Sequence, residues 1–363
     1  MRYFQEYVSN TLAGTGNQTY FQNGGAVRTG RVYYRIFQGG KLEYSLLFSN
    51  ITDSTFGSAS GCNKILEAWK ILSLRVGVCP DCSMELTAEP EDFQDVFFDG
   101  KRQRQVNPGE FLACDPFELE AAAGQCLCVE IVVQGDILPC HEEIQIPVFV
   151  REGDVWVPSP RLPVPGMIGC RREVMRRIGF LGDSITQGIG ATPGRYRHWN
   201  AEVARMLGDK NSYWNLGLGC GMAYDVASDG AWLFKAGQMD VIILCLGIND
   251  LIMGRSPEEL KRDLMRIVSR LQSIGVKVVI QTMPPFFEEP DEWVDGWQEV
   301  NEYIRTTLTQ QADGFFDVAP LLCESEKLPY KPRYGGHPND AGCAVWAEGL
   351  GEYLAPLLER FFL

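Results

Sequence analysis

The most informative segment of the chain is Gly182-Asp-Ser-Ile-Thr186. It follows directly on Arg177–Leu181, a short apolar run that we predict to be a β-strand. In an open α/β sheet the ligand crevice lies outside the carboxyl ends of the strands, so a serine at this point is well placed to be exposed and activated. The G-x-S-x-G turn that often presents such a serine is absent here. Ser184 is therefore a candidate nucleophile in a different sequence setting.

The second half of the chain alternates short apolar runs with helical patterns. Val241–Leu246 is continuously apolar, as expected for a strand buried on both faces of a sheet. Ser256, Pro257 and Glu259 form a helix start with an N-cap, a proline at the first helical position and a capping box. This order predicts a parallel sheet covered by helices, a three-layer α/β/α sandwich. Further strands are predicted at Ser212–Asn215, Val276–Gln281 and Phe315–Val318, and helices at Trp199–Leu207, Pro257–Ile274, Gly296–Leu308 and Asp340–Phe361.

The first half, to about Leu162, reads as β structure and predicts an all-β sandwich or jelly roll. A helix is expected only at Lys64–Lys70, with Asn63 as its N-cap. Residues 157–177 are rich in proline, which predicts a linker because prolines cannot all join a sheet ladder or a helix interior. We therefore expect two domains, residues 1–165 and 166–363. The predicted strands are Arg31–Phe37, Lys41–Phe48, Leu72–Val78, Gln94–Phe98, Cys126–Val133 and Ile144–Val150.

Four segments of the second half resemble the SGNH family, also called GDSL hydrolases. They are Gly182–Thr186, Asn215–Gly221, Gly247–Asp250 and His337–Asn339, and they occur in the family's order. The resemblance covers about residues 176–360 and implies an SGNH fold, which is a flavodoxin-like α/β/α sandwich. In the first half, Asp115-Pro116, Ala123-Gly124 and Leu127–Ile131 look like the β-domain that precedes the hydrolase domain in some carbohydrate esterases of this family.

The resemblance implies an ester-cleaving enzyme with Ser184 as nucleophile and His337 as base. A serine hydroxyl needs a base to remove its proton, and an imidazole can take that proton and return it to the leaving group. The donors that stabilise the oxyanion are implied to be the Ser184 N–H, a backbone N–H of the turn at Gly219 and Cys220, and the side-chain amide of Asn249.

The sequence departs from the family pattern at two positions. The oxyanion glycine of the family falls on Cys220, although flanking glycines allow the turn to survive. The family expects an aspartate three residues before the histidine, and Tyr334 stands there instead. We expect a backbone carbonyl in Arg333–Gly335 to orient the imidazole of His337. The competing expectation is a more distant carboxylate, from Glu324, Glu326 or Asp340.

The substrate implied by the resemblance is a short acyl group, acetyl above all, on a sugar or oligosaccharide. Trp293 and Trp297 stand in or after an acidic loop at the active end of the sheet, where they could stack on a sugar ring or pack in the core. Asp183 and Tyr334 are further candidates for substrate contact. No cofactor and no metal is expected for the reaction.

Composition narrows the possible partners. The chain has 363 residues, of which 45% are hydrophobic, and a net charge of −14. Nucleic-acid binding is not expected, since its affinity depends on clustered basic residues. The one cluster of basic residues here, at residues 171–177, is expected to be a solvated connector. The N-terminus lacks the apolar run of a signal peptide and no stretch is apolar enough to span a bilayer, so a cytoplasmic protein without membrane contact is expected.

The remaining histidines and the cysteines are predicted to be structural. His141 and His198 are expected to be satisfied locally. The chain has 12 cysteines, which we expect to be reduced and mostly buried. Cys79-Pro-Asp-Cys82 has the spacing of metal or redox sites, but no second C-x-x-C pair accompanies it.

Two other functions remain open at this stage. One is a lysophospholipase or thioesterase, because the same sequence blocks serve lipid esters. The other is a catalytically weak carbohydrate-binding protein, which the missing aspartate suggests.

Overall fold

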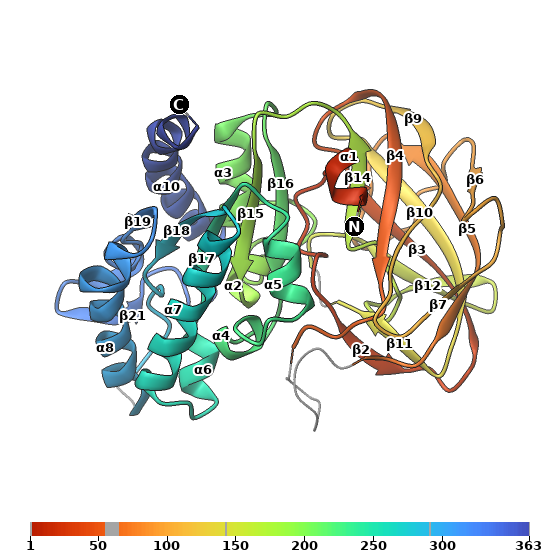
Figure 1. The fold of residues 1–363 in the computed structure, drawn as a ribbon. Helices are drawn as coiled ribbons and strands as arrows, with labels where there is room; N and C mark the ends of the chain where they lie inside the picture. The colour runs from red at the N-terminus through yellow and green to blue at the C-terminus, as the bar shows by residue number, and fades with distance from the viewer. Residues whose placement is uncertain (1, 55–64, 142–143, 290–291, 363) are drawn as a thin grey trace.

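The computed structural model describes residues 2–54, 65–141, 144–289 and 292–362. An α/β half and a β-rich half lie side by side, as Figure 1 shows. Both halves contribute to one continuous hydrophobic core. The predicted combination of an α/β/α sandwich with an all-β part is confirmed.

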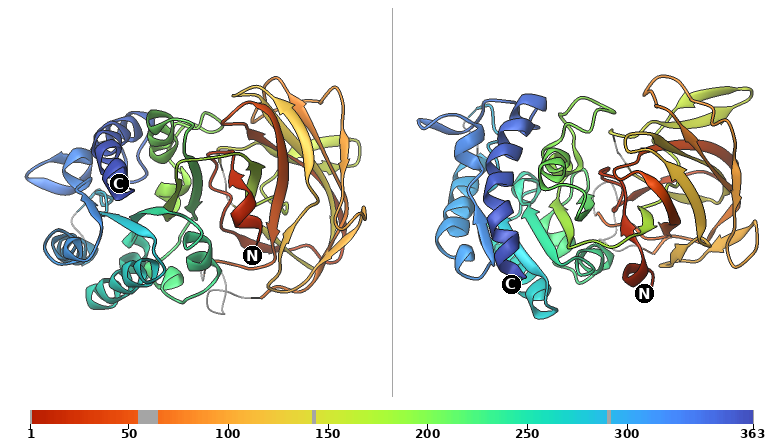
Figure 2. Two further views of the ribbon diagram at one scale, coloured as in Figure 1. Left: turned by 45° about the horizontal axis from the view of Figure 1, so that its top comes forward. Right: turned by 90° about the horizontal axis from the view of Figure 1, so that it is seen from above.

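A five-stranded parallel sheet forms the centre of the α/β half, in the order β16-β15-β17-β18-β19. Figure 2 shows that helices cover both faces of this sheet. On one face α3 and α10 pack together, with the indoles of Trp199 and Trp346 stacked at 4.6 Å. The strands are β15 (Arg177–Gly182), β16 (Ser212–Gly217), β17 (Val241–Cys245), β18 (Lys277–Gln281) and β19 (Gly314–Phe316). The helices are α2 (Ser184–Gln187), α3 (Trp199–Leu207), α4 (Ala223–Val226), α5 (Ala231–Ala236), α6 (Ile248–Ile252), α7 (Pro257–Ser273), α8 (Glu292–Thr306), α9 (Ala319–Leu322) and α10 (Asp340–Phe361).

Local sequence signals fix several of these helix ends. Ser256 and Glu259 form the predicted capping box at the start of α7. Asn339 caps α10 by accepting hydrogen bonds from the N–H groups of Ala341 and Gly342. The cap determines where the chain enters α10 and therefore where His337, two residues earlier, lies. A 3₁₀ turn, Leu308–Gln310, and a small hairpin of β20 (Cys323–Ser325) and β21 (Leu328–Pro332) complete this half.

Two antiparallel sheets make up the β-rich half. One has the order β1-β14-β4-β8 with β9 paired to β4, and the other has the order β13-β12-β3-β10-β5-β6 with β7 paired to β5. A short helix, α1 (Tyr3–Glu6), precedes them, and β2 pairs with β11. The strands are β1 (Val8–Ser9), β2 (Thr19–Gln22), β3 (Val27–Arg35), β4 (Gly40–Ser49), β5 (Trp69–Cys79), β6 (Gln94–Val96), β7 (Arg104–Val106), β8 (Phe111–Ala113), β9 (Phe117–Ala121), β10 (Cys126–Gln134), β11 (Ile137–Cys140), β12 (Val148–Glu152), β13 (Val155–Pro158) and β14 (Met167–Arg171).

The helix predicted at Lys64–Lys70 is wrong for the residues that the structure describes. Ile65 forms an isolated bridge with Ile51, and Trp69 begins β5. Trp69 is 1% exposed, so its burial between strands overrides the local helical preference. Asn63 and Lys64 lie outside the described residues.

Part of the segment expected to be a linker, residues 157–177, forms a β-strand. Met167–Arg171 forms β14, which pairs with β1 and β4 of the β-rich half. We propose that the two domains meet after this strand, between residues 171 and 177. The basic cluster at residues 171–177 connects the halves. Arg172 donates hydrogen bonds to the carbonyls of Asp209 and Asn211, and Arg177 donates one to the Phe4 carbonyl.

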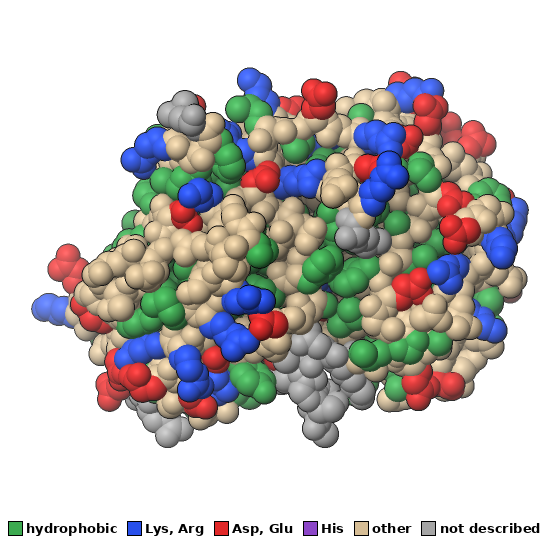
Figure 3. All heavy atoms as spheres, viewed as in Figure 1, with side chains coloured by type: hydrophobic (Ala, Val, Ile, Leu, Met, Phe, Trp, Pro, Cys, Tyr) green, Lys and Arg blue, Asp and Glu red, His purple; other side chains and the backbone are tan. Residues whose placement is uncertain are grey.

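Buried polar contacts also cross between the halves. The Asn17 amide donates to the Leu216 carbonyl at 2.6 Å. The Lys235 ammonium, itself buried, donates to the Gly16 carbonyl at 2.7 Å and to the Asp53 carboxylate at 2.8 Å. On the face seen in Figure 3, acidic and basic side chains are interspersed. Within the described ranges, no helix has the length and apolar character needed to cross a membrane.

Candidate active site

Ser184 and His337 meet at the carboxyl end of the parallel sheet. Ser184 is the first residue of α2 and follows β15, while His337 precedes α10. Ser184 Oγ lies 2.8 Å from His337 Nε2, although 153 residues separate them in sequence. Ser184 is 9% exposed and His337 is partly buried. This distance allows a proton to pass directly from the hydroxyl to the imidazole.

The turn before Ser184 is held by Asp183 and by a close approach of β16. Asp183 caps α2, and its carboxylate accepts the Ile185 N–H at 3.0 Å. The side chain is buried, and burial raises its pKa to about 7. A Cβ on Gly217 would lie 2.2 Å from the backbone nitrogen of Gln187, so only glycine lets α2 approach this strand. The carboxylate predicted to contact substrate is therefore engaged with the main chain.

The turn after β16 faces Asn249 from the start of α6. The Asn249 side-chain amide donates to the Gly221 carbonyl at 3.0 Å, which joins the second and third sequence blocks. Cys220 adopts a left-handed backbone with φ of 54°, the conformation that a glycine would adopt most easily. The turn thus persists despite the departure from the family glycine. The N–H groups of Ser184 and Gly219 donate to no other residue in the part of the chain that the structure describes.

No carboxylate of the described residues bonds to the other ring nitrogen of His337. Asp340 accepts instead from the backbone and hydroxyl of Thr192, both at 2.7 Å, and Glu324 pairs with Lys331 at 3.3 Å. Burial lowers the pKa of His337 below its usual 6.5. A neutral imidazole, the form that can accept a proton, is therefore favoured.

The carbonyl partner expected for His337 is not found among the described residues. The Tyr334 carbonyl already accepts the Asn339 N–H at 3.1 Å, as part of the turn into α10. Gly335 has a positive φ of 91°, so the glycine turn is present, but it serves the helix start and not the imidazole. The expectation that a carbonyl of Arg333–Gly335 holds the ring is wrong in this structure.

Packing orients the imidazole instead. The Phe286 ring meets the His337 ring edge to face, with centroids 5.5 Å apart. On another side, a Cβ on Gly190 would lie 2.5 Å from the His337 carbonyl oxygen and 2.8 Å from its Cβ. Sequence reasoning missed both residues. A phenylalanine just after β18, at the active end of the sheet, was the available signal for Phe286.

The two tryptophans occupy different environments. Trp293 is partly buried and stacks on Phe287 at 6.3 Å, which in turn meets Phe286. Trp297 is 2% exposed and donates its indole N–H to the Pro284 carbonyl. Of the two environments expected for Trp297, packing in the core is the one found, because its side chain is 2% exposed.

Tyr334 and the two other histidines contribute to packing. The Tyr334 side chain packs against Gly342, the Arg333 guanidinium lies 5.5 Å from its ring, and the ring is partly buried. His198 is buried and bonds to the Leu12 carbonyl at 3.0 Å. His141 is buried as well, and burial lowers the pKa of His198 to about 4 and that of His141 to about 3.

The fold and the site define an α/β/α domain with a serine–histidine pair at the carboxyl ends of its parallel strands. Residues 180–345 match the GDSL-like lipase/acylhydrolase family. This part of the chain belongs to that family, and the protein is a hydrolase of ester bonds.

Similar solved structures include members of the same family. A lipolytic G-D-S-L protein from Desulfitobacterium hafniense is 16% identical, with a TM-score of 0.42 over 48% of this chain and 98% of its own. A family two carbohydrate esterase from Cellvibrio japonicus is 14% identical, with a TM-score of 0.39 over 99% of this chain and 96% of its own. An acetyl xylan esterase is 20% identical, with a TM-score of 0.39 over 49% and 99%. No curated protein sequence matches the chain.

Proposed function

We propose that the protein is a serine esterase that works through an acyl-enzyme on Ser184, with His337 as the base. The observation that carries this proposal is the 2.8 Å contact between Ser184 Oγ and His337 Nε2. Ser184 Oγ attacks the ester carbonyl while its proton moves to Nε2. The imidazolium then protonates the leaving alcohol as the carbon–oxygen bond breaks. Water attacks the acyl-enzyme in the same way and releases the acid.

The oxyanion of each tetrahedral intermediate is assigned to three donors. They are the N–H of Ser184, the N–H of Gly219 or Cys220, and the second N–H of the Asn249 amide. The first N–H of that amide is used by the Gly221 carbonyl, which holds the group in place. Preorganised donors of this kind typically contribute about a hundred- to a thousand-fold each in rate.

The substrate we propose is a short acyl ester, above all acetate, of a sugar or oligosaccharide. The recessed position of Ser184, which is 9% exposed, favours a small acyl group. The partly buried rings of Phe286, which meets His337, and Trp293, which is linked to Phe286 through the buried Phe287, are suited to the apolar face of a sugar ring. The sugar itself rests on the resemblance of the two-part chain to carbohydrate esterases.

The nucleophile is tested with Ser184→Ala. We expect loss of p-nitrophenyl acetate hydrolysis by a thousandfold or more, on the order found when a catalytic serine is removed elsewhere. A fluorophosphonate probe should label the wild type at Ser184 and leave the variant unlabelled. Ser73→Ala, on β5 of the other half, is the matched control and should keep full activity. Turnover that survives in Ser184→Ala would refute the assignment.

The acyl preference is tested separately with p-nitrophenyl acetate, butyrate, octanoate and laurate. We expect kcat/KM to be highest for acetate and to fall with chain length, and acetylated xylo- and gluco-oligosaccharides to be deacetylated. An optimum at octanoate or laurate would overturn the sugar proposal and favour a lysophospholipase or thioesterase, while leaving Ser184 in its role.

A further inference from the structure

Four cysteines gather on one face of the larger β-sheet, apart from the active site. Cys79 at the end of β5 and Cys126 at the start of β10 lie directly opposite each other in the strand register. Cys128 lies two residues further along β10 and therefore on the same face. All three are fully buried in a small cluster that is separate from the main core. Cys82 packs against this cluster from the loop that follows β5.

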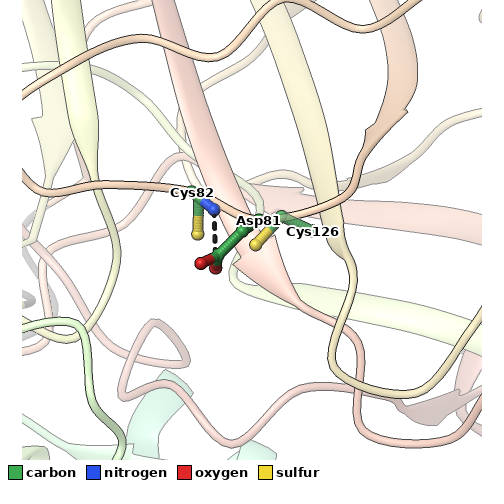
Figure 4. Close-up of side chains that lie close together, drawn as sticks. All are labelled: Asp81, Cys82 and Cys126. Atoms are coloured by element: carbon green, nitrogen blue, oxygen red, sulfur yellow. Dashed lines mark hydrogen bonds between the residues drawn. The ribbon is translucent and has the colours of Figure 1, made fainter.

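The loop after β5 brings the Cys82 thiol and the Asp81 carboxylate to this cluster. The Sγ atoms of Cys82 and Cys126 and a carboxylate oxygen of Asp81 lie within 4.8 Å of one another. Figure 4 shows the two sulfur atoms on either side of the Asp81 carboxylate. That carboxylate accepts the Cys82 N–H at 2.8 Å and pairs with Arg35 at 3.0 Å. Asp81 therefore fixes the turn that points Cys82 at Cys126.

The four thiols interact in two pairs. Cys79 hydrogen-bonds to Cys128, and Cys82 hydrogen-bonds to Cys126. Cys79 and Cys82 also influence each other electrostatically, so the pairs adjoin. The cysteines of the described ranges are all free thiols.

Two arginines supply positive charge to the same cluster. Arg31 acts electrostatically on Cys79 and Cys128, and Arg35 acts on Cys82 and Cys126. Both come from β3, the strand on the other side of β10. Arg31 pairs with Glu89 and Glu130, and Arg35 pairs with Asp81, so the thiols lie beside a network of charged side chains and not in a plain hydrophobic core.

We propose that Cys79, Cys82, Cys126 and Cys128 bind one zinc ion as a structural tetrathiolate site. Zinc prefers four thiolates in tetrahedral geometry, with Zn–S bonds of about 2.3 Å that place the sulfur atoms about 3.8 Å apart. The sulfur atoms of Cys82 and Cys126 lie within 4.8 Å of each other, and the strand register brings Cys79 and Cys128 beside them, so binding would draw the four sulfur atoms together. On binding, the four thiols release four protons to solvent, and the resulting site carries a charge of −2 that Arg31 and Arg35 face.

The site has a structural consequence for the join between the halves. The loop that carries Cys82 continues to Met84, whose side chain packs on Gly194 so closely that a Cβ there would lie 2.8 Å from Met84 Cγ. Gly194 belongs to the segment between α2 and α3, which also carries Gly190 against His337. Zinc would thus fix the loop of the β-rich half that supports this segment.

The decisive experiment is a metal analysis of the full chain, purified with a cleavable non-metal affinity tag and without chelators. We expect about one zinc per chain, released by a thiol-modifying reagent and detected with a colorimetric chelator. Cys82→Ser and Cys126→Ser should lower the zinc content at least tenfold. Cys114→Ser and Cys323→Ser, which change cysteines outside the cluster, should keep it.

Cobalt substitution makes the test independent of variant folding. Cobalt(II) added to metal-free wild-type protein should give the strong thiolate-to-cobalt charge-transfer band and the visible bands of a tetrahedral thiolate site. Asp81→Asn should keep these bands, because the proposal gives Asp81 no bond to the metal. A wild-type protein that binds neither zinc nor cobalt would overturn the proposal. So would intact-mass evidence of a disulfide between these cysteines, or loss of metal in Asp81→Asn but not in Cys79→Ser.

Discussion

At the scale of single residues, the proposed role of His337 as the base predicts how activity depends on pH. The base must be neutral to accept the serine proton, so activity falls as pH drops through the pKa of His337. Burial lowers this pKa below 6.5, and no carboxylate of the described residues raises it. We therefore predict that the acidic limb of kcat/KM has its midpoint below pH 6.5, measured with p-nitrophenyl acetate.

The buried carboxyl group of Asp183 could also affect the pH profile of kcat/KM. One variant separates its titration from that of His337. The pKa of Asp183 is raised by burial to about 7. Asp183→Asn keeps an oxygen for the Ile185 N–H and removes the titration. The acidic limb should stay in place in this variant. A limb that shifts or disappears would assign the titration to Asp183 and contradict the role given to His337.

A related prediction concerns the absent triad acid. Asp340→Asn and Tyr334→Phe should each change kcat/KM less than about tenfold, because removal of a working triad aspartate typically costs about ten-thousandfold. Asp340 is engaged with Thr192, and Tyr334 serves the turn through its carbonyl. Steady-state kinetics with p-nitrophenyl acetate measure this. A loss of a thousandfold in Asp340→Asn would mean that this carboxylate moves to His337 during turnover.

At the scale of elements, the segment between α2 and α3 positions the base. Gly190 has a positive φ of 98°, and a Cβ at this position would meet the His337 backbone at 2.5 Å. We predict that Gly190→Ala displaces His337 and lowers kcat at least about a hundredfold, since a misplacement of about 1 Å has this effect. Initial-rate kinetics together with an unfolding curve test it.

Gly208 provides a matched control for backbone strain. It also has a positive φ, 77°, but a Cβ there would meet nothing within 4 Å. Gly208→Ala should lose stability from its conformation and keep its kcat. Equal activity in the two variants would show that contact with Gly190 does not position His337.

The elements that the sequence predicted well are those with local signals. The boundaries of α3 and α10 agree with the predicted Trp199–Leu207 and Asp340–Phe361, and the capping box at Ser256 starts α7. β14 was missed because its pairing with β4 depends on residues more than a hundred positions away, whereas the surrounding prolines dominate the local pattern. Trp69 was placed in a helix because its strand partner, Val106, is 37 positions away and leaves no local signal.

The site residues that could be predicted from the sequence are those that lie in short motifs. Ser184, His337 and Asn249 each stand in a short motif at the end of a strand or the start of a helix, and they meet at one end of the sheet. Phe286, Gly190 and the pairing of Cys79 and Cys82 with Cys126 and Cys128 could not be found this way. Their contacts arise only when separate segments fold together, and no fixed spacing in the sequence indicates these contacts.

At the scale of the whole molecule, a buried ion pair is one of the contacts that hold the two halves together. Lys235 of α5 contacts Asp53 and the Gly16 carbonyl, and both charged side chains are buried. We predict that Lys235→Met lowers the free energy of unfolding by about 3–5 kcal/mol, because it leaves the Asp53 carboxylate without its partner. Urea denaturation followed by tryptophan fluorescence measures this.

Two comparisons make the interpretation specific. Adding Asp53→Asn to Lys235→Met should recover part of the loss, since the remaining charge is removed. Lys41→Met breaks an exposed pair with Glu118 of the same 2.8 Å length and should change stability little. A double variant that is no more stable than Lys235→Met would show that the uncompensated carboxylate is not the cause of the loss.

The contact between Asn17 and Leu216 also bears on how the chain emerges from the ribosome. The two residues are 199 positions apart, and at a synthesis rate of 5–20 residues per second the second follows the first by about 10–40 s. During that interval the segment around Asn17 has no partner strand of the parallel sheet to bind. The Asn17 amide therefore lacks its acceptor until β16 is made, and a nascent chain stalled short of Leu216 should leave this segment more open to protease than a chain stalled beyond α10.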